Sequence, residues 1–272
     1  MMEKYSVYMS VYCKENPEFF KKSVESMLNQ TISPDEIIIV CDGPLTEELD
    51  KVIDELCATN PCIKIVRLPE NKGRSYAAQA GLDACRNEIV LRMDSDDISV
   101  PTRAEKSLEA LKNCDIVGGV IAEFSDDITD VTGLRVLPLT HKEIVKFSKK
   151  RSPINNVTVA FKKSVIQKAG GYDVTLKYAE DYYLWVKAIQ NGAICKNLND
   201  IFVYVRAGKG MATRRNNEFY KATKALRKYM LKTKYINIFQ YILYNTSQWI
   251  VFHLPNELKL WIYKKFLRKK SK

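Results

Sequence analysis

The sequence predicts an α/β protein whose central sheet is mainly parallel and covered by helices, followed by a basic, helical C-terminal extension. Two observations predict the sheet. Strand and helix patterns alternate with short connections over the first 124 residues, and several strand patterns are continuously apolar. Continuous apolar runs are typical of strands buried on both faces, and repeated strand–helix units build parallel sheets. A third observation, uneven charge, sets the extension apart.

The net charge of +11 is concentrated at one end of the chain. Residues 206–272 contain 17 Lys and Arg and two acidic residues, a segment charge of +15, whereas the preceding 205 residues sum to −4. Such a segment indicates a polyanionic partner, either a membrane surface or a nucleic acid. The seven cysteines occur singly and no signal peptide is visible, so we expect a reducing cytoplasm.

The first 124 residues contain five strand patterns and four helix patterns. The helix patterns have apolar residues three or four positions apart, as at Phe20, Val24 and Met27 after the opening Pro17. The expected strands are residues 5–13, 36–41, 63–68, 88–92 and 116–124, and the expected helices are 17–31, one that starts at 46, 74–86 and 101–113.

Beyond Phe124 the alternation is looser. Residues 125–140 are expected to form a loop or short hairpin, and Gly170-Gly171 to close a short helix. The expected elements are helices 141–150, 164–169 and 181–190 and strands 157–161 and 201–205. We therefore assign residues 1–215 to one domain and 216–272 to a basic amphipathic helical tail.

The tail has the composition of a helix lying on a membrane. Residues 235–254 are rich in Ile, Tyr, Phe and Trp, but polar residues interrupt them, so no apolar run reaches the roughly 20 residues that span a bilayer. Aromatic residues beside Lys and Arg favour an anionic membrane surface over nucleic acid; packing on the domain is the alternative. The residues expected at the interface are Phe239, Tyr241, Trp249, Phe252, Trp261 and Phe266.

An acidic run, Asp94-Ser95-Asp96-Asp97, follows the fourth expected strand. In an open parallel sheet, ligands bind beyond the carboxyl ends of the strands. Three carboxylates there repel one another unless a cation neutralises them, and Mg²⁺ or Mn²⁺ binds one or two carboxylates together with phosphate oxygens. The alternative is that Asp96 or Asp97 caps the following helix.

Two further acidic positions are candidates. Asp42 ends the second strand and could accept a hydrogen bond from a pyrimidine base, although Asp42-Gly43-Pro44 is also a turn former. Glu180 and Asp181 open a helix, where acidic residues commonly complement the helix dipole. The functional interpretation makes Asp181 a general base that deprotonates a hydroxyl group.

Together these motifs resemble the family 2 inverting glycosyltransferases with the GT-A fold over residues 4–210, and are similar to the amylovoran-type exopolysaccharide enzymes. The motifs that carry the resemblance are Ser10-Val11-Tyr12, residues 26–31, Asp42, Asn71-Lys72-Gly73, Asp94-Ser95-Asp96-Asp97, residues 152–164, Gly170-Gly171-Tyr172 and Glu180-Asp181. The sequence departs from the family pattern at Gln79-Ala80, where Arg-Asn is frequent, and at Asn156, where the related branch carries histidine. The Gln-x-x-Arg-Trp signature of processive polymerases is absent from the sequence.

The resemblance implies a role for each matching position. It implies a GT-A nucleotide-binding domain that transfers a single sugar from a nucleoside-diphosphate sugar, UDP-linked by expectation, to a lipid-linked or saccharide acceptor in bacterial surface polysaccharide synthesis. The implied donor-site residues are Val11, Glu15 and Asp42 at the nucleobase, Gly73 and Arg74 near the uridine, Asp94 at the ribose or sugar with Ser95 beside it, and Asp96 at the Mn²⁺ or Mg²⁺ ion, with Asp94 as a second ligand. Asp181 is implied as the catalytic base.

Two other functional classes fit parts of the sequence. A nucleotidyltransferase can share the sheet and the paired aspartates, but it normally has a Gly-rich phosphate loop, and residues 5–20 contain no glycine. A non-enzymatic membrane- or nucleic-acid-binding protein would use the basic tail alone. The expected location is the cytoplasm, peripherally on the inner face of the cell membrane.

Overall fold

The computed structural model describes residues 4–125, 127–206, 217–255 and 258. Nine strands form one sheet in the order β3-β2-β1-β4-β8-β6-β9-β5, with β7 paired to β6. The strands are β1 (Tyr5–Val11), β2 (Glu36–Cys41), β3 (Ile63–Arg67), β4 (Ile89–Arg92), β5 (Ile98–Ser99), β6 (Ile116–Phe124), β7 (Val131–Arg135), β8 (Ala160–Lys162) and β9 (Cys195–Arg206). The helices are α1 (Pro17–Leu28), α2 (Glu47–Thr59), α3 (Arg74–Ala84), α4 (Arg103–Leu111), α5 (His141–Ser148), α6 (Lys163–Lys168), α7 (Glu180–Gln190), α8 (Asn217–Lys232) and α9 (Ile238–His253), with a 3₁₀ turn, η1 (Asn156–Thr158).

The N-terminal part of the sheet is parallel. β3, β2, β1 and β4 pair in parallel, as do β6 and β9, whereas β8, β5 and β7 are antiparallel to their neighbours. The predicted α/β fold with a mainly parallel central sheet is confirmed. Because β1 to β4 run the same way, the segments that follow them emerge at one edge, which we call the carboxyl edge.

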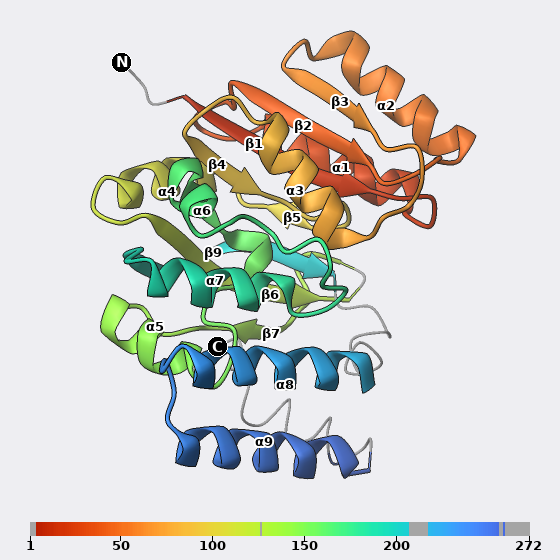
Figure 1. Cartoon of the computed structure of the whole chain (residues 1–272). Helices are drawn as coiled ribbons and strands as arrows, with labels where there is room; N and C mark the ends of the chain where they lie inside the picture. The colour runs from red at the N-terminus through yellow and green to blue at the C-terminus, as the bar shows by residue number, and fades with distance from the viewer. Residues whose placement is uncertain (1–3, 126, 207–216, 256–257, 259–272) are drawn as a thin grey trace.

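Helices cover both faces of the sheet (Figure 1). α1, α2 and α4 pack on one face, where Phe20 and Leu108 join the core of β1 and β2. α3, α5, α6 and α7 pack on the other face, where Leu82 and Trp185 contribute to a second core. These two layers hold the loops of the carboxyl edge between rigid elements.

Three expectations need correction. The strand expected at 157–161 begins instead as η1, because the Thr158 hydroxyl donates to the Asn155 carbonyl at 2.7 Å and accepts from the Gly119 amide at 3.0 Å in place of a strand ladder. β9 starts at Cys195, six residues earlier than expected. β5 was not predicted, since two residues carry no periodicity.

The described part of the C-terminal segment forms two helices, α8 and α9, as predicted, and contributes to the domain core. α8 packs on α7, where Leu226 and Met230 meet Tyr182 and Val186, and α9 lies outside α8 (Figure 1). The expected boundary at 215/216 lies outside the described residues. Within the described part of the chain, no helix has the length and apolarity needed to cross a bilayer.

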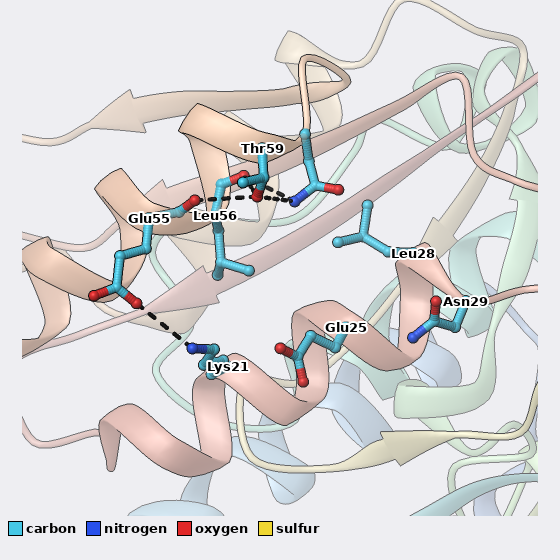
Figure 2. Close-up of a pocket in the computed structure, with 8 residues that line it drawn as sticks. Lys21, Glu25, Leu28, Asn29, Glu55, Leu56 and Thr59 are labelled. Atoms are coloured by element: carbon cyan, nitrogen blue, oxygen red, sulfur yellow. Dashed lines mark hydrogen bonds and ion pairs between the residues drawn. The ribbon is translucent and has the colours of Figure 1, made fainter.

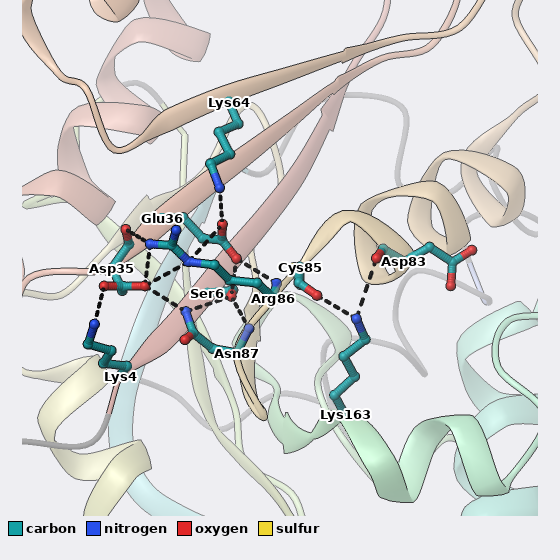
Figure 3. A network of polar contacts seen from close by, with 10 residues as sticks. All are labelled: Lys4, Ser6, Asp35, Glu36, Lys64, Asp83, Cys85, Arg86, Asn87 and Lys163. Atoms are coloured by element: carbon teal, nitrogen blue, oxygen red, sulfur yellow. Dashed lines mark hydrogen bonds and ion pairs between the residues drawn. The ribbon is translucent and has the colours of Figure 1, made fainter.

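A polar network connects the strands at the opposite edge of the sheet, where β1 to β4 begin (Figure 3). We call this the amino edge. Glu36, which is fully buried at the start of β2, accepts hydrogen bonds from the Ser6 hydroxyl at 2.6 Å, the Arg86 amide at 2.7 Å and the Lys64 ammonium at 2.8 Å. The Arg86 guanidinium in turn pairs with Asp35 at 2.6 Å. These contacts join β1, β2 and β3 to the segment between α3 and β4.

Candidate active site

Asp42 organises the loop between β3 and α3. Its buried carboxylate accepts the amide of Lys72 at 2.8 Å and that of Gly73 at 3.0 Å, while the Asn71 side chain donates to the Asp42 carbonyl at 3.2 Å. The Asp42 amide donates to the Val11 carbonyl at 2.8 Å, which ties the loop to the end of β1. The predicted nucleobase residues Val11 and Asp42 therefore lie together with Gly73, which is predicted near the uridine, and Asp42 also holds the backbone.

Gly73 and Arg74 open α3 at this edge. Gly73 has a φ of +85°, and no side chain caps the first turn of the helix. Arg74 is the first helical residue, and its charge partly opposes the rise in the pKa of Glu180, the first residue of α7, that burial and Asp181 cause. The predicted donor-site residue Arg74 is thus within electrostatic reach of the predicted catalytic helix.

Glu15 is bound to the acidic run that follows β4. Its carboxylate accepts the Ser95 hydroxyl at 2.5 Å, and the Ser23 hydroxyl of α1 donates to the Asp94 carbonyl at 2.6 Å. The loops after β1 and β4 are consequently held in a fixed relation. Glu15, expected at the border of the nucleobase pocket, is joined to the expected metal-binding run.

Asp97 is a buried carboxylate whose negative charge is only partly balanced by its surroundings. It is 3% exposed and accepts the Arg206 amide at the end of β9 at 2.9 Å. Burial, together with the negative charges of Asp96 and Asp94, raises the pKa of Asp97 well above its ordinary value. An added cation would relieve this excess negative charge.

The acidic run is suited to bind a divalent cation whose coordination shell is completed by a bound substrate. Among the residues that the structure describes, no three acidic, His or Cys side chains are grouped so that they could enclose a metal. Mg²⁺ and Mn²⁺ commonly take one or two carboxylates and complete their shells with water and substrate phosphates. Asp94 and Asp96 supply that number of carboxylates beside the under-compensated Asp97.

Arg92 is a site residue to which the sequence patterns assigned no role. Its buried guanidinium forms an ion pair with Asp94, and its Nη1 has no hydrogen-bond partner among the described residues. Burial opposes its charge, yet Asp94 and the hydroxyls of Tyr8 and Tyr172 raise the pKa of Arg92 above its ordinary value. An arginine within an otherwise apolar strand was the available signal.

Asp181 lies in the first turn of α7, where its Oδ2 accepts the Ser152 hydroxyl at 3.4 Å. The neighbouring Glu180 is buried, and burial together with Asp181 raises its pKa, while Arg74 and Arg92 oppose the rise. The Tyr8 and Tyr172 hydroxyls, 2.7 Å apart, connect β1 to the loop that precedes α7. The structure thus brings the start of α7 into the electrostatic environment of Arg92 and Arg74.

A separate surface hollow of about 470 Å³ opens between α1 and α2 (Figure 2). It is lined by residues 21–29 of α1 and its C-cap and by residues 55–60 at the end of α2, and Lys21 and Glu55 approach to 3.5 Å within it. These helix ends lead back to the amino edge of the sheet. No predicted site residue lines the hollow, so we do not assign it to the chemistry.

Residues 6–168 match the family model for glycosyl transferase family 2. The chain is a family 2 glycosyltransferase. This membership confirms the resemblance inferred from the motifs and decides against the nucleotidyltransferase and the non-enzymatic alternatives.

Relatives of this glycosyltransferase extend over most of its length. An uncharacterized glycosyltransferase of Haemophilus influenzae is 44% identical over 78% of this chain and 79% of the relative. A UDP-Gal:alpha-D-GlcNAc-diphosphoundecaprenol beta-1,3-galactosyltransferase of Escherichia coli is 36% identical over 98% and 97% of the two chains. The amylovoran biosynthesis glycosyltransferase AmsE of Erwinia amylovora is 33% identical over 96% and 98%. The similarity to the amylovoran-type enzymes is confirmed.

Solved structures show that the fold is shared. Residues 1–349 of Staphylococcus aureus TarS, in complex with UDP, superpose with a TM-score of 0.66 at 16% identity, covering 95% of this chain and 78% of that one. The mannosyltransferase PcManGT of Pyrobaculum calidifontis, in complex with GDP-Man and Mn²⁺, superposes with a TM-score of 0.64 at 16% identity, covering 94% and 72%. The predicted GT-A fold is confirmed.

Proposed function

We propose that this glycosyltransferase moves a single sugar, with inversion, from a UDP-linked donor to a lipid-linked or saccharide acceptor in bacterial surface polysaccharide synthesis. The observation that carries the proposal is the carboxyl edge itself. There the run Asp94–Asp97, the buried Arg92 and the start of α7 with Asp181 influence one another electrostatically. This arrangement offers carboxylates for a cation that a departing diphosphate would share, and a separate carboxylate, Asp181, for an acceptor hydroxyl.

Val11 and Asp42 would line the nucleobase pocket with Glu15 at its border, Gly73 and Arg74 would lie near the uridine, and Ser95 would lie beside Asp94 at the ribose or sugar. Asp96, with Asp94, would hold Mn²⁺ or Mg²⁺. Such an ion, when bound, would neutralise the charge that develops on the diphosphate leaving group. The excess negative charge around Asp97 supports this assignment, because a cation would stabilise all three carboxylates.

Asp181 would act as the general base. As the acceptor oxygen forms its bond to the anomeric carbon, the bond from that carbon to the diphosphate oxygen breaks on the opposite face, and Asp181 takes the hydroxyl proton. Its hydrogen bond from Ser152 supports the assignment, since it orients one carboxylate oxygen and leaves the other available. Arg92 would position Asp94 through their ion pair.

The acceptor assignment draws on the relatives. One is named for transfer from UDP-Gal to a diphosphoundecaprenol-linked sugar. An acceptor of that chemical class lies in a membrane, and the +15 segment would hold the enzyme peripherally on the anionic inner face of the cell membrane. We therefore propose a cytoplasmic enzyme that works at the membrane surface.

The test is to incubate the protein with Mn²⁺ and a panel of UDP-, dTDP- and GDP-sugars, with and without a diphosphate-linked lipid acceptor. We expect slow hydrolysis of one UDP-sugar without acceptor and rapid transfer with it. Hydrolysis confined to a GDP- or dTDP-sugar would contradict the UDP assignment. Absence of both hydrolysis and transfer with every donor would contradict the proposal.

A further inference from the structure

Helix α9 makes polar contacts with the domain and exposes apolar side chains to the outside. Its inner side faces α8 with polar groups: the Arg227 guanidinium of α8 contacts Asn245 at 3.3 Å and also Gln248. The Gln248 amide donates to the Thr223 hydroxyl at 2.6 Å. None of the 16 residues of α9 is buried. A helix on a water-soluble domain normally directs its apolar side inward.

The outer side of α9 carries six large aliphatic and aromatic residues, while Tyr241 and Phe252 face the domain. At 100° per residue the six share one stripe of the helix surface. Phe239 is 79% exposed, Leu243 60% and Trp249 52%, and each of the others is at least half exposed. The stripe consists of Ile238, Phe239, Ile242, Leu243, Trp249 and Ile250. A contiguous apolar stripe of this kind marks a surface that is covered in the working protein.

Lysines run alongside the stripe. Lys221, Lys224, Lys228 and Lys232 recur on α8 at helical spacing and are exposed. Lys224 and Trp249 line the same shallow groove between α8 and α9, so a cation stands next to the apolar stripe. By sequence, residues 254–272 add seven Lys and Arg against one acidic residue.

The charge identifies the partner. A second copy of this chain seated on α9 would bring two rows of lysines and two basic segments together, and like charges would oppose the contact. An anionic bilayer supplies both an apolar layer for the stripe and phosphates for the lysines. α9 is too short to span, because 16 residues fall below the roughly 20 that a bilayer requires.

We propose that α9 lies in the plane of an anionic bilayer, with the stripe from Ile238 to Ile250 inserted and the lysines of α8 at the phosphate level. The inference rests on the proposed function only in that a lipid-linked acceptor would lie in the same bilayer. It also corrects two residues expected at the interface. Tyr241 packs against the core formed by α7 and α8, and the Phe252 ring stacks on Tyr220 with centroids 5.2 Å apart. Trp261 and Phe266 lie outside the described residues.

Substitution is a cleaner test than truncation, because α8 belongs to the domain core. The Phe239→Ser/Leu243→Ser double variant keeps the net charge and removes only stripe side chains. The matched control is Ile194→Ser/Leu139→Ser, which removes two exposed apolar residues elsewhere. We expect the full-length protein to co-float with phosphatidylglycerol-containing vesicles, the stripe variant to partition about tenfold more weakly or worse, and the control to match wild type.

Fluorescence gives an independent readout. Trp185 is fully buried, so a Trp261→Phe background leaves Trp249 as the exposed reporter. Its emission should shift to shorter wavelength on addition of anionic vesicles and be quenched by brominated lipid. Lys224→Gln/Lys228→Gln should weaken binding at low salt and leave a salt-resistant part.

Three outcomes would overturn the inference. The wild-type protein could stay in the soluble fraction with anionic vesicles at low salt, or the stripe variant could float as well as wild type. The third outcome is a wild-type dimer that becomes a monomer in the stripe variant. Hydrolysis of the UDP-sugar without vesicles separates this inference from the proposed function. Intact hydrolysis with failed flotation rejects the membrane face, and with it the peripheral attachment, but leaves the sugar transfer standing. Flotation without hydrolysis rejects the sugar transfer and leaves the membrane face standing.

Discussion

The two edges of the central sheet both contain carboxylates with little exposure to solvent, and the pKa values of these carboxylates shift in opposite directions. At the amino edge, burial alone would raise the pKa of Glu36, but hydrogen bonds from Arg86, Lys64 and Ser6 outweigh it and hold that pKa below its ordinary value. At the carboxyl edge, burial and neighbouring acids raise the pKa values of Asp97 and Glu180. Burial raises the pKa at both edges, and the direction of the net shift follows from the neighbours: hydrogen-bond donors and cations surround Glu36, whereas further acidic residues lie beside Asp97 and Glu180. The structural edge is internally neutralised, whereas the edge of the candidate site retains excess negative charge that a bound cation would compensate.

The largest effect should follow from removing the cation that the carboxyl edge is proposed to bind. EDTA should abolish transfer, and Asp96→Ala should lower it by about 10³ because the leaving diphosphate loses its neutralising charge. Circular dichroism should show an intact fold. Full activity in excess EDTA would reject the metal assignment.

Asp181→Asn should reduce transfer by about 10² or more and leave donor affinity near wild type, since the near-isosteric amide cannot take a proton. Single-turnover transfer and donor titration measure the two quantities separately. Loss of donor binding instead would show that Asp181 serves the structure of α7 rather than the chemistry.

Glu36→Gln at the amino edge should lower the free energy of unfolding by about 2 kcal/mol at pH 7, because charged hydrogen bonds are lost. The lowered pKa means that the carboxylate stabilises the fold above its unfolded pKa of about 4.3, and that this contribution disappears as pH falls through the folded value. Urea denaturation should therefore show a smaller difference between variant and wild type below about pH 4. Donor affinity per folded molecule should not change.

Asp97→Asn, at the carboxyl edge, should change the free energy of unfolding in the opposite direction. A raised pKa means that the ionised carboxylate costs stability above its unfolded pKa of about 3.9, so the amide should stabilise the metal-free protein at pH 7 by about 1 kcal/mol or leave it unchanged. An asparagine oxygen can still accept the Arg206 amide. Mn²⁺-dependent donor binding should weaken, and a marked loss of stability at pH 7 would contradict this account.

The smallest effect on stability and transfer is expected from a substitution in the hollow between α1 and α2. Glu55→Gln removes one exposed ion pair, with Lys21, and should change stability by no more than about 0.5 kcal/mol. Transfer kinetics should match wild type. A clear loss of transfer would give the hollow a role that its position at the amino edge does not suggest.

The sequence by itself determined the alternation of strands and helices and the edge at which Asp42, Gly73 and Asp94–Asp97 emerge, because apolar periodicity and strand direction are local properties that sum to a parallel sheet. It also carried the family motifs. Its errors were local: η1 replaced part of a strand where Thr158 satisfies the backbone with its side chain, and β5 was too short for any pattern.

Only the tertiary structure decided which charges meet. The contact of Glu15 with Ser95 and the influence of Arg74 and Arg92 on Glu180 join residues from separate elements, and electrostatic compensation depends on distance through space. The tail shows the same division. Its composition indicated an amphipathic helix, but only the structure shows which side of α9 faces α8: Asn245 and Gln248 contact the buried Arg227, and Tyr241 packs on the core of α7 and α8.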